Sequence, residues 1–83
     1  EEEREARRQA QRSRREEEAR QQRVAELEAE IHALEDNLQA LRAEIEEATA
    51  GQQALRIHEL GTRYAELDSQ LQDRLEKWAE VAA

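Results

Sequence analysis

Apolar residues recur at alternating steps of three and four positions through the middle of this 83-residue chain. The series begins at Val24 and continues without a break to Ala48. Such alternation is the seam of a helix that buries one narrow stripe against another helix, and it indicates a coiled coil. The members of this first seam are Val24, Leu27, Ile31, Leu34, Leu38, Leu41, Ile45 and Ala48.

A second apolar series follows after a short interruption. Two successive steps of four around Leu71 predict a stutter, which locally relaxes the left-handed supercoil. Thr49 is a poor helix residue and Gly51 suits the left-handed conformation of a helix C-terminal cap, so we expect a turn at about residues 50–53 between helices at about 23–49 and 54–82. The members of this second seam are Ile57, Leu60, Tyr64, Leu67, Leu71, Leu75, Trp78 and Ala82.

The shortness of the turn determines how the two helices meet. Helices of similar length joined by so few residues must fold back on each other. We therefore predict an all-α fold: an antiparallel two-helix coiled-coil hairpin over residues 23–83, with an N-terminal helical overhang. In the best register Leu38 faces Leu67 and Leu27 faces Trp78. The flanking pairs are then Glu44 with Arg63, Asn37 with Gln70, Glu30 with Lys77 and, with like charge, Glu35 with Asp68.

Residues 1–22 form an Arg/Glu-rich helical extension or linker whose seam line is too polar to pack tightly. Arg4, Arg8, Arg12 and Arg15 follow one another at steps of four, four and three, which groups them on one helical face. That face fits either a solvated helix or a surface that contacts RNA or DNA backbone. No aromatic residue lies between these arginines, so base stacking has no platform here. Self-association through the overhang is a further expectation.

The composition of the chain excludes several classes of function. The chain has a net charge of −8, two aromatic residues and no cysteine, and it contains no apolar run of the roughly 20 residues that a membrane span needs. Its carboxylates lie on an open convex surface with no pocket to shift their pKa values, and His32 and His58 lack ligand neighbours. We therefore expect no catalytic residue, no metal and no cofactor. Because the chain starts at Glu1 rather than Met, we expect it to be a piece of a larger protein.

The two aromatic residues each have a structural role in this register. We expect Trp78 to close the open end of the seam against Leu27 and Val24, with an anchor for a partner as the alternative. Tyr64 is expected at the edge of the core, where its hydroxyl reaches water.

The second helix carries a run Leu60-Gly61-Thr62-Arg63-Tyr64-Ala65-Glu66-Leu67 and closes on Leu75-Glu76-Lys77-Trp78, and the first contains Glu26-Leu27-Glu28-Ala29-Glu30-Ile31. Over about Val24 to Val81 this order resembles the C-terminal coiled-coil domain of the ABC-F subfamily of ATP-binding cassette ATPases, although the turn is shorter than that family's connection. The resemblance implies a cytoplasmic parent protein with two nucleotide-binding domains and no membrane domain.

In such a parent protein, this domain would be a non-catalytic arm that contacts ribosomal RNA or DNA through its arginine-rich end. The parent protein would act in translation, on the ribosome. Residues 1–23 would then be the Arg-rich connection to the second ATPase domain. The alternative function is a structural spacer or a homo-oligomerisation coiled coil without nucleic-acid binding.

Overall fold

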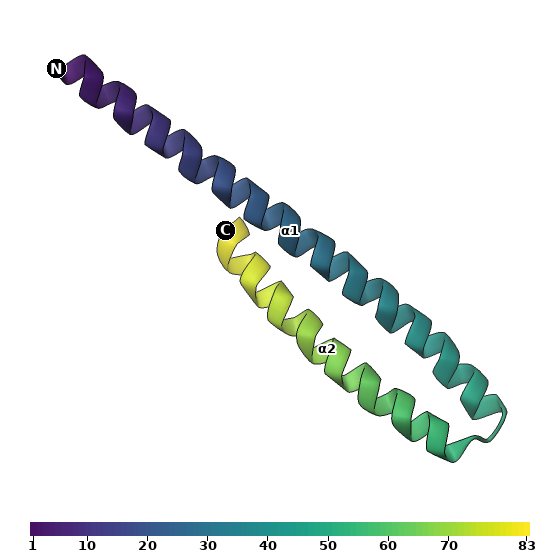
Figure 1. Cartoon of the computed structure of the whole chain (residues 1–83). Helices are drawn as coiled ribbons and strands as arrows, with labels where there is room; N and C mark the ends of the chain where they lie inside the picture. The colour runs from purple at the N-terminus through teal and green to yellow at the C-terminus, as the bar shows by residue number, and fades with distance from the viewer.

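The computed structural model describes all 83 residues as two helices in a hairpin (Figure 1). Helix α1 spans Glu2–Ala50 and α2 spans Ala54–Ala82, and only three residues connect them. The two helices run antiparallel, side by side from the turn to the C-terminus. The prediction of an all-α hairpin with an N-terminal helical overhang is confirmed.

The difference in helix length produces the overall shape, a rod of 76 × 15 × 14 Å. Helix α1 has 49 residues and α2 has 29, so α1 continues well beyond the end of α2 (Figure 1). At about 1.5 Å per residue, α1 accounts for the whole long dimension of the rod. Every residue from Glu1 to Arg23 is exposed, so the first part of α1 is a single helix surrounded by solvent.

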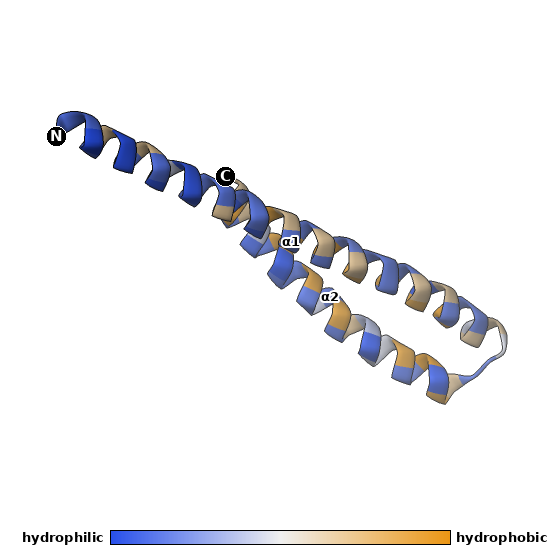
Figure 2. Cartoon of the chain, turned by 45° about the horizontal axis from the view of Figure 1, so that its top comes forward, coloured by the Kyte–Doolittle hydropathy of each residue, from blue (hydrophilic) through white to orange (hydrophobic).

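The core is a thin seam between the two helices, and only six side chains are buried. Leu27, opposite Trp78 in the register, is the most deeply buried, with no exposed area. Near the turn a cluster of buried residues is surrounded by partly buried apolar side chains. Apolar residues gather along the hairpin, whereas the overhang is almost entirely hydrophilic (Figure 2). The buried residues are Leu27, Ile31, Leu38, Leu41, Ala48 and Leu60.

Most other seam positions are half-buried, and Leu75 is the exception, with 36% of its surface exposed. In its place Arg74 faces α1, where its Nε donates to Glu30 Oε2 at 2.7 Å. The contact line of α2 thus keeps alternating steps of three and four, and the predicted stutter is not present in it. Arginine suits this position because its methylene stem can lie along the seam while its guanidinium reaches a carboxylate. The half-buried seam residues are Val24, Leu34, Ile45, Ile57, Tyr64, Leu67, Leu71, Trp78 and Ala82.

Gly51 is the C-cap of α1, as predicted, but the expected left-handed conformation is wrong for it, because Gly51 has φ −84° and Gln52 has φ 55°. The Gln52 N–H donates to the Thr49 carbonyl at 3.1 Å, and the Gln53 N–H donates to the Ala48 carbonyl at 2.9 Å. These two bonds form the Schellman motif that commonly ends a helix, with the left-handed residue one position after the cap. Glycine is usual at that position, but here it is occupied by glutamine.

Replacing Gln52 with glycine should therefore stabilise the hairpin. A side chain in the left-handed region costs about 1–2 kcal/mol, and glycine removes that cost at some expense in chain entropy. We expect Gln52→Gly to raise the free energy of unfolding by up to about 1 kcal/mol in a urea titration. Gly51→Ala is the control and should change stability little, since an added Cβ meets its nearest neighbours at an ordinary 3.5 Å. Destabilisation by Gln52→Gly would contradict this description of the turn.

Leu38→Asp tests the seam itself. Leu38 is 3% exposed in the middle of the hairpin, and an aspartate there would place an unpaired charge between the helices. We expect a loss of several kcal/mol, enough to abolish most of the helical circular dichroism of the hairpin. The matched control is Gln39→Asp at the neighbouring exposed position, which should keep the fold.

Candidate nucleic-acid interface

The overhang contains a basic segment, residues 4–15, with six arginines and one glutamate and hence a net charge of +5. Acidic residues enclose it, with Glu1 to Glu3 on one side and Glu16 to Glu18 on the other. The acidic first turn of α1 lies at the positive end of the helix dipole, which favours helix formation there. The basic segment is therefore presented on a helix and is exposed throughout.

The four predicted contact arginines form a ladder along this helix, which we call the arginine ladder: Arg4, Arg8, Arg12 and Arg15. Arg8, Arg12 and Arg15 line one shallow hollow together with Gln11, and Arg4 precedes Arg8 by about one turn. The ladder extends over about 16 Å of helix. None of its members takes part in an ion pair or a side-chain hydrogen bond, so all four guanidinium groups are free to bind an anion.

Some other arginines, Arg20 among them, are occupied by contacts within the chain. Arg20, at the end of the hairpin, donates from Nη1 to the Val81 carbonyl at 3.1 Å. Its Nε and Nη2 donate to the two carboxylate oxygens of Glu17 at 3.0 and 2.6 Å. The hydrogen bond from Arg20 lowers the pKa of Glu17 from its usual 4.5. Arg20 therefore attaches the last turn of α2 to α1 and satisfies a terminal carbonyl.

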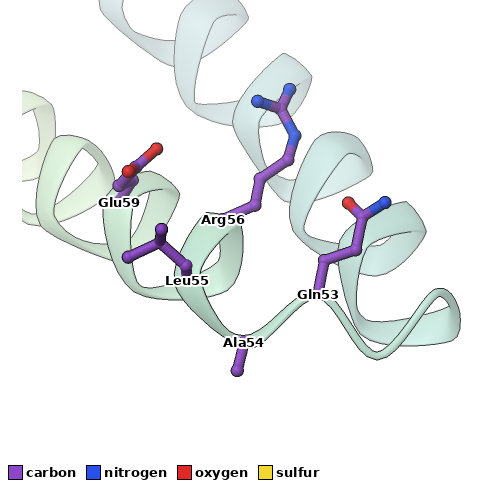
Figure 3. Close-up of a pocket in the computed structure, with 5 residues that line it drawn as sticks. All are labelled: Gln53, Ala54, Leu55, Arg56 and Glu59. Atoms are coloured by element: carbon purple, nitrogen blue, oxygen red, sulfur yellow. The ribbon is translucent and has the colours of Figure 1, made fainter.

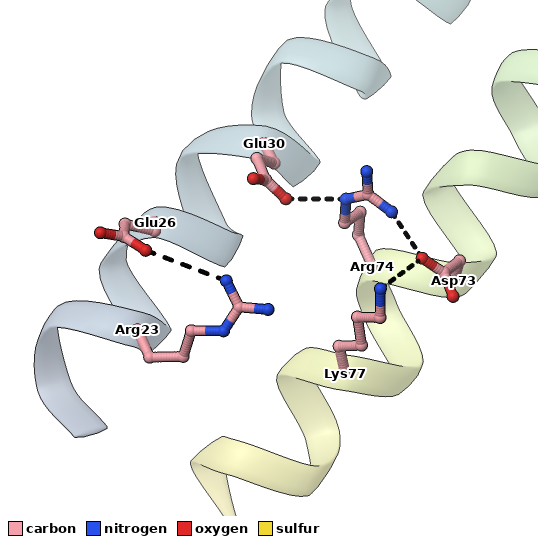
Figure 4. A network of polar contacts seen from close by, with 6 residues as sticks. All are labelled: Arg23, Glu26, Glu30, Asp73, Arg74 and Lys77. Carbon is pink, nitrogen blue, oxygen red and sulfur yellow. Dashed lines mark hydrogen bonds and ion pairs between the residues drawn. The ribbon is translucent and has the colours of Figure 1, made fainter. Parts of the chain in front are cut away.

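Arg23, Arg74 and Lys77 pair with nearby carboxylates (Figure 4). Arg74 joins Glu30 of α1 to Asp73 of α2, and Lys77 Nζ lies 3.1 Å from Asp73 Oδ2. The hydrogen bond from Lys77, with a smaller contribution from Arg74, lowers the pKa of Asp73. Glu30 thus pairs with Arg74 and not with Lys77.

Glu44 also has a different partner from the predicted one. It pairs with Arg56 at 3.7 Å, while Arg63 lines a hollow beside it without an ion pair. Residues 24–83 nevertheless contain fourteen acidic and five basic side chains, so the hairpin remains strongly acidic.

Both aromatic side chains belong to the hairpin. The Tyr64 hydroxyl, predicted to reach water, accepts hydrogen bonds from Arg42 Nε at 3.0 Å and Nη2 at 2.7 Å. Trp78 is half-buried, and its indole N–H is buried without a hydrogen-bond partner. Neither ring is near the basic segment, so a ligand bound there meets charge and not an aromatic surface.

The remaining hollows are open patches on the rod. The one at the turn is lined by Gln53, Ala54, Leu55, Arg56 and Glu59 (Figure 3). Leu55 is 72% exposed there, and the side chains do not converge on a common point. No group of three or more His, Asp or Glu side chains is arranged to hold a metal ion. His32 and His58 are both exposed on the surface. Neither helix combines the length and apolar content that crossing a bilayer requires.

Replacing Arg20 with glutamine should loosen the end of the hairpin. The variant loses the bond to the Val81 carbonyl, and we expect faster amide hydrogen exchange in the last turn of α2 while residues near the turn keep their protection. The Glu17–Arg20 pair should also make stability depend on pH. Because the pKa of Glu17 is lowered, the pair stabilises the folded chain fully above pH 4.5, and this stabilisation is lost as the pH falls through the lowered pKa. Unchanged exchange at the end of α2 in Arg20→Gln would contradict the role of this contact.

Comparison of the chain with models of known protein families, with curated proteins and with solved structures finds no match.

Proposed function

We propose that this chain is a non-catalytic helical arm whose overhang contacts the phosphate backbone of RNA or DNA. The observation that supports this best is the arginine ladder, four guanidinium groups on one exposed helical face without partners in the chain. Guanidinium groups bind phosphate oxygens through paired, charge-assisted hydrogen bonds. The surrounding net charge of +5 adds attraction at longer range.

The distribution of charge also favours one orientation on the nucleic acid. The hairpin contains nine more acidic than basic residues over 24–83, so phosphates repel it. A chain bound through the arginine ladder would keep its hairpin directed away from the polyanion. This orientation is what an arm needs if its far end is to reach another molecule.

The chemistry of the ladder supports contact without sequence preference. Its groups carry charge but no aromatic platform for stacking, and phosphate contacts fix position without reading bases. Affinity should then come mainly from the release of counterions and should fall steeply with salt.

The resemblance to the ABC-F coiled-coil domain suggests a setting for this arm. In that setting the parent protein is a cytoplasmic ATPase that acts on ribosomes, and the arm contacts ribosomal RNA. The support for this part of the proposal is the residue pattern of Leu60–Leu67 and the terminal Trp78, together with a hairpin geometry that suits such an arm.

Fluorescence anisotropy with labelled RNA and duplex DNA over a salt series tests the proposal. Replacing Arg4, Arg8, Arg12 and Arg15 with glutamine should weaken binding at every sequence tested. The slope of log K against log salt should fall by about 3 to 4, since each phosphate contact contributes about 0.7–0.9.

The matched control removes four arginines from other parts of α1 and α2, as Arg23, Arg42, Arg56 and Arg63 to glutamine. It should keep most of the affinity and the original salt slope, with the fold confirmed by circular dichroism. Absence of binding at low salt would reject the arm and favour a structural spacer or an oligomerisation element. Equal losses in the two variants would reject the ladder as the contact surface.

A further inference from the structure

The two flanks of the hairpin differ in how their charges are paired. On one flank Glu30 pairs with Arg74, and Glu44 pairs with Arg56. On the other flank no ion pair joins the two helices. This second flank, which we call the acidic flank, carries Glu28, Glu35 and Arg42 of α1 and Asp68 of α2, and its one cation, Arg42, is bonded to the Tyr64 hydroxyl.

The carboxylates of the acidic flank form no ion pair with an arginine or a lysine, although Arg42 lines one hollow together with Glu35. Glu28 makes no hydrogen bond or ion pair, and the nearest side-chain nitrogen to Glu35 Oε1 is His32 Nδ1 of its own helix, at 3.6 Å. The register places Asp68 opposite Glu35, which brings like charges together. Leu75 follows Asp68 by seven residues and thus lies on the same side of α2, with 36% of its surface exposed. This flank therefore combines unpaired negative charge with exposed apolar surface.

Glu28 and Glu35 belong to a longer stripe on α1, with one residue at every seventh position: Arg7, Arg14, Gln21, Glu28 and Glu35. The series would continue at Arg42, but this arginine is bonded to Tyr64 of α2, so the stripe ends at Glu35. Seven residues are close to two helical turns, so the stripe follows one side of the helix, and it keeps facing a partner when two helices supercoil. Its charges read positive, positive, neutral, negative and negative. All five side chains are exposed, and the two arginines take part in no ion pair.

When two copies of this stripe run in opposite directions, each positive charge of one copy lies opposite a negative charge of the other. We propose that a second copy of this chain binds antiparallel along the stripe, with Gln21 of both copies at the two-fold axis. Arg7 of each copy then meets Glu35 of the other, and Arg14 meets Glu28. The spacing matches at every position because both sides repeat at about 10.5 Å. Such an interface uses the same surface on both copies and closes at a dimer.

The structure favours this occupant over others. A parallel pair would bring Arg7 against Arg7 and Glu35 against Glu35, which repel. The overhang cannot fold onto its own hairpin, because α1 is one continuous helix that directs the overhang away (Figure 1). The overhang of a second copy has about the length of the α1 stretch that it would cover, and it would lie over the exposed Leu75.

The proposed interface leaves the arginine ladder accessible. Arg8 and Arg15 each follow a stripe arginine by one residue and thus point about 100° away around the helix, and Arg4, three residues before Arg7, points about 60° away. The dimer and the nucleic-acid contact therefore use different faces, and each can be tested without the other.

Sedimentation velocity at low and high salt tests the dimer through charge reversal. We expect the unmodified chain to dimerise at low salt and to dissociate as salt rises. Arg7→Glu with Arg14→Glu makes the stripe wholly acidic, and Glu28→Arg with Glu35→Arg makes it wholly basic. Each variant should raise the dimer Kd at least about tenfold, and an equimolar mixture of the two should form a heterodimer.

Arg8→Glu with Arg15→Glu is the matched control, since it makes the same change in net charge on another face and should leave the Kd within about twofold. A chain that stays monomeric at low salt, a control that acts like the stripe variants, or a mixture that fails to associate would each overturn the proposal.

A cysteine at the symmetry axis tests the register separately. The chain has no cysteine, so Gln21→Cys introduces one thiol per copy. Only at a two-fold axis do identical positions meet, and there we expect intermolecular disulfide formation at least about tenfold faster than for Arg8→Cys. Equal rates at the two positions would overturn the register.

Discussion

The fold depends on a single stripe of apolar contact between two helices. Most of its members are only half-buried, and the chain has no second layer to support them. A seam of this kind determines the register, because shifting either helix would bring charged side chains into the contact line. The polar contacts that cross it, Arg74 with Glu30 and Arg42 with Tyr64, lie at its edges and follow from that register.

The unequal length of the two helices links the fold to the proposed functions. Because α2 ends opposite the region of Arg20, the first part of α1 has no partner within the chain. That part holds most of the unpaired arginines, whereas the hairpin holds the excess of carboxylates. The same helix thus presents a basic face to a polyanion and a charge-patterned stripe to a second copy, on different sides.

Sequence reasoning was sufficient for the architecture and insufficient for individual side chains. Apolar spacing predicted both helices and the overhang, because burial of the seam dominates the free energy, and the short turn predicted their antiparallel direction. It could not predict that Gln52, and not Gly51, would take the left-handed conformation, because the hydrogen bonds from the N–H groups of Gln52 and Gln53 determine which residue does so.

The position of Arg74 was missed for a related reason. Leu75 is the apolar residue nearest to the expected seam position, and the prediction placed it there. An unbroken alternation of three and four from Leu71 instead gives Arg74, Trp78 and Val81. The ion-pair partners also differ from those predicted, because long side chains can reach either of two carboxylates at small cost. The sequence also could not predict that the four arginines of the ladder have no partner in the chain, because acidic residues lie close to them on the same helix.

Distance measurement between two spin labels tests the central claim most directly. Ala29 and Glu76 lie opposite each other on the outer faces of the two helices in this register, and the chain has no native cysteine to interfere with labelling. In doubly labelled chains diluted with unlabelled ones, the hairpin predicts a single distance of about 20–30 Å, set by two helix diameters. A distance of about 70 Å, as in one uninterrupted helix, would contradict it.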